Sequence, residues 1–145
     1  MKEYCPYDLS VKLCEAGFDR PCLAWYNTDF CTDGTPVKVV SSSHKPKEGP
    51  MKWRNSELFG NGNVSAPTFA SAERWLREDK GFDIEVRIWF VGDEREYRPY
   101  ILPPGCNDFV AFPPEKTPEE AHFSAIREIL GVLGLVTDNT STQKQ

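Results

Sequence analysis

FDIEVRIWFV, the stretch Phe82–Val91, gives the strongest strand signal in the chain. Its alternation of apolar and polar residues places one apolar set on a single face of an extended strand: Phe82, Ile84, Val86, Ile88 and Phe90. The opposite face carries Asp83, Glu85, Arg87 and Trp89. Gly92-Asp93 then signals a turn into an antiparallel partner, EYRPYIL (Glu96–Leu102). Pro99 lacks an N–H, so we expect this partner strand to lie at a sheet edge or to be interrupted there.

Three helices are expected around this hairpin. The first begins at Pro6 or Asp8 and ends at Gly17, where a left-handed residue is favoured. The second begins near Ser65–Thr68, with Ser65 as the N-cap candidate and an i, i+4 pair of Glu73 and Arg77, and ends at Gly81. The third begins at a capping box, Thr117-Pro118-Glu119-Glu120, and continues as a broad apolar stripe.

The remaining strands are short. Cys22–Asn27 and Val37–Ser41 are expected to form a hairpin with a long loop, and Asp108–Phe112 is a further strand candidate. Residues 41–66 are expected to form a long loop. We therefore predict an α+β fold, with an antiparallel sheet of four or five strands packed by three helices. The element order is α-β-β-loop-α-β-β-(β)-α, in one domain over residues 1–136 followed by a flexible tail at 137–145.

Composition limits the class of protein. The chain has 145 residues, 39% of them hydrophobic, and a formal net charge of −5, so it is acidic. It has no apolar run long enough for a transmembrane helix and no signal-peptide pattern, so we expect a cytoplasmic protein that makes no membrane contact. Its five cysteines include no CxxC pair, and they are expected to be thiols in a reducing compartment, with no metal and no cofactor.

A basic island interrupts this acidic chain. Residues 36–54 carry five basic side chains against one acidic one. Trp53 lies among four of them, so a base can stack on its ring while neighbouring cations meet phosphate; the candidate set is Lys45, Lys47, Lys52, Trp53 and Arg54. The competing interpretation, which we favour, is a solvated loop held to the domain by Trp53 and Phe59. Nucleic-acid or anion binding through residues 45–54 therefore stays an alternative.

Catalytic signals are sparse. The chain contains two histidines, His44 and His122, and neither sits in a nucleophile motif. Adjacent carboxylates occur at turns and helix ends, where charge and solvation explain them. GNGN (Gly60–Asn63) does not follow a strand as a phosphate-binding loop would. We assign no catalytic residue, favour a non-catalytic role, and keep a small hydrolase or nuclease as a further alternative.

Four stretches together resemble a family of small proteins found in prophages and mobile elements of Bacteroides-type gut bacteria. They are YDLSVKLCEAGFDRPCLAWY (Tyr7–Tyr26), KWRNSEL (Lys52–Leu58), SAPTFASAERWLREDKGFDIEV (Ser65–Val86) and TPEEAHFSAIREIL (Thr117–Leu130). The resemblance implies a phage or mobile-element context and a cytoplasmic host. It implies no activity and no catalytic or binding residues.

The function expected from these observations is that of an interaction module. Trp89 is predicted on the face opposite the apolar set, and Trp25 is expected to be placed similarly on its own strand. Exposed aromatic side chains of this kind mark contact surfaces. We expect the partner to be a host or phage protein or a small ligand, with nucleic acid less favoured.

Overall fold

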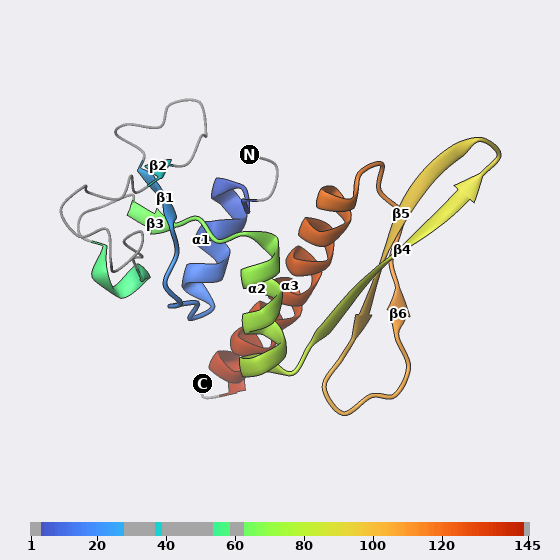
Figure 1. Ribbon diagram of the computed structural model, residues 1–145. Helices are drawn as coiled ribbons and strands as arrows, with labels where there is room; N and C mark the ends of the chain where they lie inside the picture. Colours follow the sequence, from blue (N-terminus) through green and yellow to red (C-terminus); the bar gives the residue numbers. More distant parts are fainter. Residues whose placement is uncertain (1–3, 28–36, 39–53, 59–62, 144–145) are drawn as a thin grey trace. The chain divides into compact units, whose positions relative to one another are not determined.

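The computed structural model describes residues 4–27, 37–38, 54–58 and 63–143 (Figure 1). The chain divides into two compact units, Met1–Thr68 and Phe69–Gln145. Helices and antiparallel sheets occur in both, so the predicted α+β class is confirmed. Each unit has its own three-stranded sheet, and the expectation of one sheet of four or five strands is therefore wrong. A single domain over residues 1–136 stays a prediction.

The N-terminal unit packs one helix against a small sheet. Helix α1 (Tyr7–Glu15) ends as predicted, because Gly17 takes a φ of 102° and the N–H of Phe18 donates to the Leu13 carbonyl at 2.9 Å. Strand β1 (Ala24–Asn27) is central, with β2 (Val37–Lys38) on one side and β3 (Asn63–Ser65) on the other. The predicted pairing of the first two strands is confirmed. Buried side chains of the helix and sheet form the core: Leu9, Leu13, Phe18, Ala24, Tyr26 and Val64.

The segment predicted as a loop at 41–66 contains regular structure. Besides β3 it includes a short 3-10 helix, η1 (Asn55–Glu57). Ser65 pairs with Trp25 in the sheet, so its predicted role as a helix N-cap is wrong. A strand of three residues is too short to show an alternating pattern, so β3 was not predictable from the periodicity of the sequence. The rest of this segment lies outside the described residues.

The C-terminal unit begins with a helix that changes its winding. Helix α2 (Phe69–Trp75) continues as a π-helical turn, η2 (Leu76–Lys80), and Gly81 ends it with a φ of 80°, as predicted. The predicted Glu73–Arg77 pair is replaced by an ion pair between Arg74 Nε and Glu78 Oε1 at 2.6 Å. Because Glu73 instead pairs with His122 on helix α3 (Pro118–Gln143), its carboxylate is not directed toward Arg77.

The predicted hairpin is confirmed as the two longest strands. Strand β4 (Asp83–Val91) pairs with β5 (Glu94–Leu102) across the two-residue turn Gly92-Asp93. The φ of 63° at Gly92, with no positive φ at Asp93, is typical of a type II′ turn. Strand β6 (Val110–Ala111), also predicted, pairs with the other side of β5.

Pro99 lies in the central strand of this sheet, so its predicted place at an edge is wrong. Its backbone faces the β6 side, where its carbonyl accepts a hydrogen bond from the Phe112 N–H at 3.0 Å. The missing N–H of proline therefore faces away from β4, and its absence removes no bond from the ladder between β4 and β5. The ladder between β4 and β5 stays continuous past Pro99.

Helix α3 (Pro118–Gln143) closes the unit. Its capping box is confirmed, because the Glu120 N–H donates to Thr117 Oγ1 at 3.1 Å. Most of the segment predicted as a flexible tail at 137–145 is helical, since α3 continues to Gln143.

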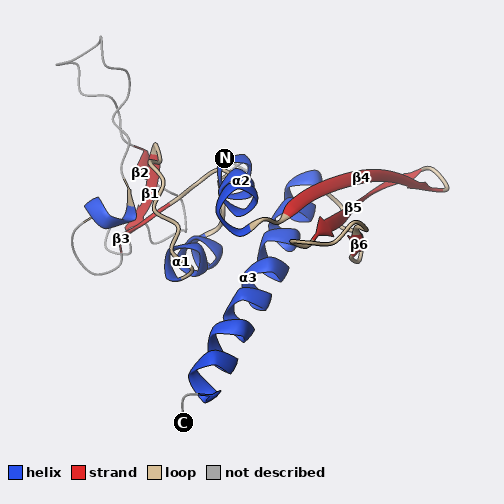
Figure 2. Ribbon diagram, turned by 90° about the horizontal axis from the view of Figure 1, so that it is seen from below, coloured by secondary structure: helices blue, strands red, loops and turns tan. Residues whose placement is uncertain are grey.

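The helices cover only one end of the apolar face of β4. Phe82 is 8% exposed, but Ile88 and Phe90 are exposed, so the prediction that the whole apolar set is buried is wrong at its outer half. A strand of nine residues is about 30 Å long, whereas a helix is only about 10–12 Å wide. The hairpin therefore projects past α2 and α3 (Figure 2).

Candidate functional site

The outer end of the hairpin carries the large apolar side chains with the highest exposed fractions in the described part of the chain. Ile88, Trp89, Phe90 and Val91, here called the hairpin tip, are 54%, 50%, 64% and 60% exposed. Successive residues of a strand point to opposite faces, so the tip is apolar on both sides. Water-exposed apolar surface of this kind is stabilised when a partner covers it, by about 25 cal/mol per Å².

Cations border the tip without covering it. The Arg95 guanidinium lies 5.3 Å from the centre of the Phe90 ring, which is its cross-strand neighbour. On the other face, the Arg87 guanidinium lies 4.1 Å from the Tyr100 ring and 5.8 Å from the Phe109 ring. Hydrogen bonds from Arg87 to Glu85 raise the pKa of Arg87, so this charge is permanent.

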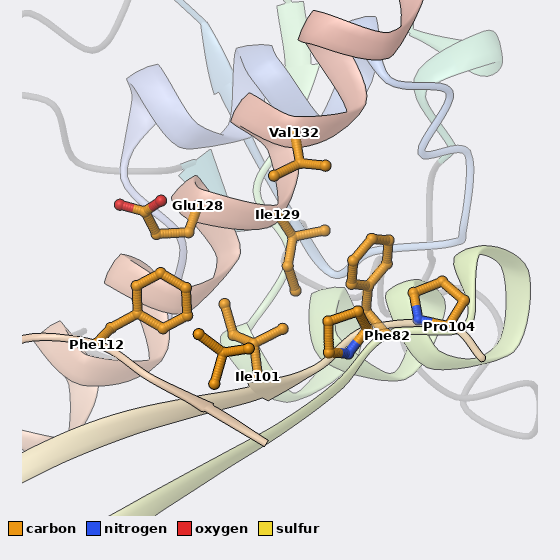
Figure 3. A pocket seen from close by; sticks show the side chains of 9 residues that line it. Phe82, Ile101, Pro104, Phe112, Glu128, Ile129 and Val132 are labelled. Carbon is orange, nitrogen blue, oxygen red and sulfur yellow. The ribbon is translucent and has the colours of Figure 1, made fainter. Parts of the chain in front are cut away.

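A second feature lies at the opposite end of the sheet. An apolar pocket of about 300 Å³ opens between the sheet and α3 (Figure 3). Its lining residues come from both: Phe82, Ile101, Pro103, Pro104, Val110, Phe112, Glu128, Ile129 and Val132. Glu128 is the one charged group among them. The volume is at the lower limit for a small-molecule site, and the lining offers little to orient a ligand.

His122 is held by its neighbours in the interface between α2 and α3. Its ring stacks on Phe69 with centres 4.3 Å apart, and its Nδ1 meets the Glu73 carboxylate. Both polar side chains are largely buried. The pair joins two helices, and among the described residues it belongs to no group of three His, Cys, Asp or Glu side chains that could hold a metal ion. His44 lies outside the described residues.

The predicted anion-binding set lies mostly outside the described residues. Lys45, Lys47, Lys52 and Trp53 lie outside the described residues, and Arg54 is the member that the structure places. Its Nη1 donates to the Asp19 carbonyl at 3.0 Å. Arg54 thus contributes to a contact within the N-terminal unit, and the set as a whole stays a prediction.

Residues 54–58, the described part of the KWRNSEL segment, are hydrogen-bonded to the connection that follows α1. Asn55 donates to the Phe18 carbonyl at 2.8 Å and accepts from the Ser65 N–H at 2.7 Å. Asp19 accepts from both the N–H and the hydroxyl of Ser56, at 2.8 and 2.9 Å. These hydrogen bonds connect three of the four stretches that carry the resemblance, through Phe18 and Asp19, Asn55 and Ser56, and Ser65.

The stabilisation that the hydrogen bonds between Asp19 and Ser56 provide depends on pH. These hydrogen bonds lower the pKa of the Asp19 carboxyl group. A carboxyl group whose pKa is lower in the folded protein stabilises the fold at pH values above its unfolded pKa of about 3.9. This stabilisation is lost as the pH falls through the folded-state pKa.

We therefore expect Asp19→Asn to lower the free energy of unfolding at pH 7 by at most about 1 kcal/mol, because the group is exposed. Denaturant titrations should show the difference from wild type shrinking below about pH 4; a constant difference would contradict this origin.

The two predicted tryptophans differ in placement. Trp89 belongs to the hairpin tip, whereas Trp25 is half-buried and lies in the central strand β1. The sequence identified Trp89 from its alternation but missed the rest of the tip, because it assigned Ile88 and Phe90 to the core. The pocket was also missed, since its lining comes from segments up to fifty residues apart, from Phe82 to Val132.

The described part of the chain offers neither a cluster of metal ligands nor a membrane-spanning helix. There, no three His, Cys, Asp or Glu residues are grouped closely enough to hold a metal ion. Among these same residues, no helix combines the length and apolar character needed to cross a bilayer.

Comparison with protein-family models, with curated proteins and with solved structures finds no match to this chain. The resemblance to a Bacteroides prophage family therefore remains an expectation from the sequence.

Proposed function

We propose that this chain is a non-catalytic protein-binding module whose contact surface is the hairpin tip. The observation that carries the proposal is the set of four consecutive large apolar residues, each at least half exposed, on an arm that extends past its helices. Exposed patches with aromatic anchors are typical of protein interfaces, and tryptophan is the residue most enriched among those that dominate binding energy.

The partner that fits this surface is a protein with an apolar groove. Trp89 and Phe90 point to opposite faces of the hairpin, so a groove has to enclose the tip to cover both rings. A small ligand in the pocket is less well supported, because Glu128 is the one charged group that would orient it. The family resemblance adds the expectation that the partner is a cytoplasmic host or phage protein.

Substitution of both tip rings should strongly weaken partner capture. We expect Trp89→Ala with Phe90→Ala to weaken binding by about thirtyfold or more, since interface anchors contribute at least ~2 kcal/mol. The measurement is affinity capture of the full chain from its native cells, followed by titration of the recovered protein. The matched control is Leu23→Ala, which removes an exposed apolar side chain outside both the hairpin tip and the pocket.

The control also separates binding from folding. Wild type and Leu23→Ala should retain the same partner at the same stoichiometry, with unchanged far-ultraviolet circular dichroism in all three proteins. If the double variant retains the partner as well as the control does, the tip is not the contact surface.

A further inference from the structure

The hydrogen bonds of β5 show which backbone groups of β4 point away from β5. Tyr97 exchanges two backbone hydrogen bonds with Glu115, and the Pro99 carbonyl accepts from Phe112. The N–H and C=O of one strand residue point to the same side, so Tyr97 and Pro99 both face away from β4. Their partners in the β4 ladder are Ile88 and Val86. These are therefore the non-hydrogen-bonded pairs of the ladder.

It follows that Ile84, Val86 and Ile88 direct their backbone N–H and C=O groups away from β5. In the described part of the chain, β4 is the last strand of its sheet on that side. An unpaired strand edge is a template for a further strand, because its donors and acceptors are already aligned.

The side chains along this edge are complementary to themselves. From Ile84 to Ile88 the sequence is apolar, acidic, apolar, basic, apolar. When this segment is paired antiparallel with a copy of itself about Val86, Ile84 faces Ile88 and Glu85 faces Arg87. Val86 becomes a hydrogen-bonded pair with itself, which is what its outward backbone groups require. A slip of two residues in either direction, which moves the centre of the pairing to Arg87 or to Glu85, would set Arg87 against Arg87 or Glu85 against Glu85.

We propose that β4 pairs with β4 of a second copy of this chain, antiparallel and centred on Val86, to form a continuous six-stranded sheet. The inference goes beyond the proposed function, since it concerns the strand edge and its occupant is an identical chain. The two opposite-charge pairs fall at non-hydrogen-bonded positions, where facing side chains are closest. The pairing also covers Ile88, which is 54% exposed in the single chain.

A weak, concentration-dependent dimer is expected. The paired segment has five residues, Ile84–Ile88, whereas stable interfaces use roughly 20–30 residues a side. Sedimentation velocity of the full chain over a concentration series should therefore show a reversible monomer–dimer equilibrium.

Charge exchange tests the register directly. Glu85→Lys sets two like-charge pairs across the axis, and so does Arg87→Glu. We expect each variant alone to dimerise at least about tenfold more weakly than wild type, because each opposite-charge pair contributes up to ~1 kcal/mol and each like-charge pair destabilises. An equimolar mixture of the two variants should recover the dimer, since the introduced lysine then faces the introduced glutamate and Arg87 faces Glu85.

Val86→Pro tests the backbone pairing. It removes an N–H that β5 does not use, so the hairpin keeps its own ladder while the central pair of the dimer loses both of its hydrogen bonds. We expect a monomer with a circular dichroism spectrum like that of wild type. If the proline variant unfolds, the Glu85→Lys and Arg87→Glu variants still test the proposed strand pairing.

The outcomes separate this inference from the proposed function. A wild-type chain that stays monomeric at its highest soluble concentration overturns the self-pairing, and so does a dimer that the two single charge variants form as well as wild type. The Trp89 and Phe90 double variant reports on partner capture independently. A monomeric Glu85→Lys protein that still captures the partner shows that the tip works without the strand edge.

Discussion

Replacing Ile126 by alanine is expected to lower the free energy of unfolding by about 2–5 kcal/mol, the usual range for an isoleucine truncated in a core. Ile126 is fully buried in α3, in the core of the C-terminal unit. The loss combines the transfer free energy of the removed methyl groups with the cavity that they leave. Equilibrium urea unfolding followed by circular dichroism measures it, and Ile126→Val should cost only about 0.5–1.5 kcal/mol.

The matched control is the same substitution at the hairpin tip. Ile88→Ala removes the same atoms from a side chain that is 54% exposed, so the free energy of unfolding should change by no more than about 0.5 kcal/mol. A comparable loss at both positions would show that the tip is packed in solution and would contradict its assignment as a contact surface.

Leu13→Ala is expected to have an effect of similar size, about 2–5 kcal/mol, in the N-terminal unit. Leu13 is fully buried on α1, where its carbonyl also accepts the hydrogen bond that ends the helix. Leu23→Ala is the control, because Leu23 is exposed. Amide hydrogen exchange measures the effect along the chain.

This experiment also tests the predicted single domain. In one cooperative domain, Leu13→Ala lowers protection in α3 as much as in α1, since both open in the same global transition. A loss confined to the amides of residues 4–27 and 63–68 would show that the two units unfold separately, which contradicts a single domain over 1–136.

Much of the local structure was predictable because its causes are local. The capping box at Thr117 and the glycines at 17, 81 and 92 act through hydrogen bonds and backbone conformations within a few residues. The alternation in Phe82–Val91 likewise specifies a strand and its two faces without reference to any other element. The class of fold followed from the order of these elements.

The candidate site was only partly predictable. Trp89 was correctly placed away from the helices, but the pattern assigned Ile88 and Phe90 to a buried face. An alternating sequence states which residues share a face, and it carries no information about how far a helix reaches along that face. The outcome was decided by the length of β4 relative to the width of the helices that cover it.

The sequence by itself determined the ends of α1 and η2, the hairpin of β4 and β5, and the start of α3, since each depends on residues near one another in the chain. Only the tertiary structure decided that β3 completes the first sheet and that Pro99 lies in a central strand. It also decided that no other described residues cover the hairpin tip or pair with the β4 edge. Those features depend on contacts between distant segments. Their free energy comes from burial and strand pairing that no local pattern records.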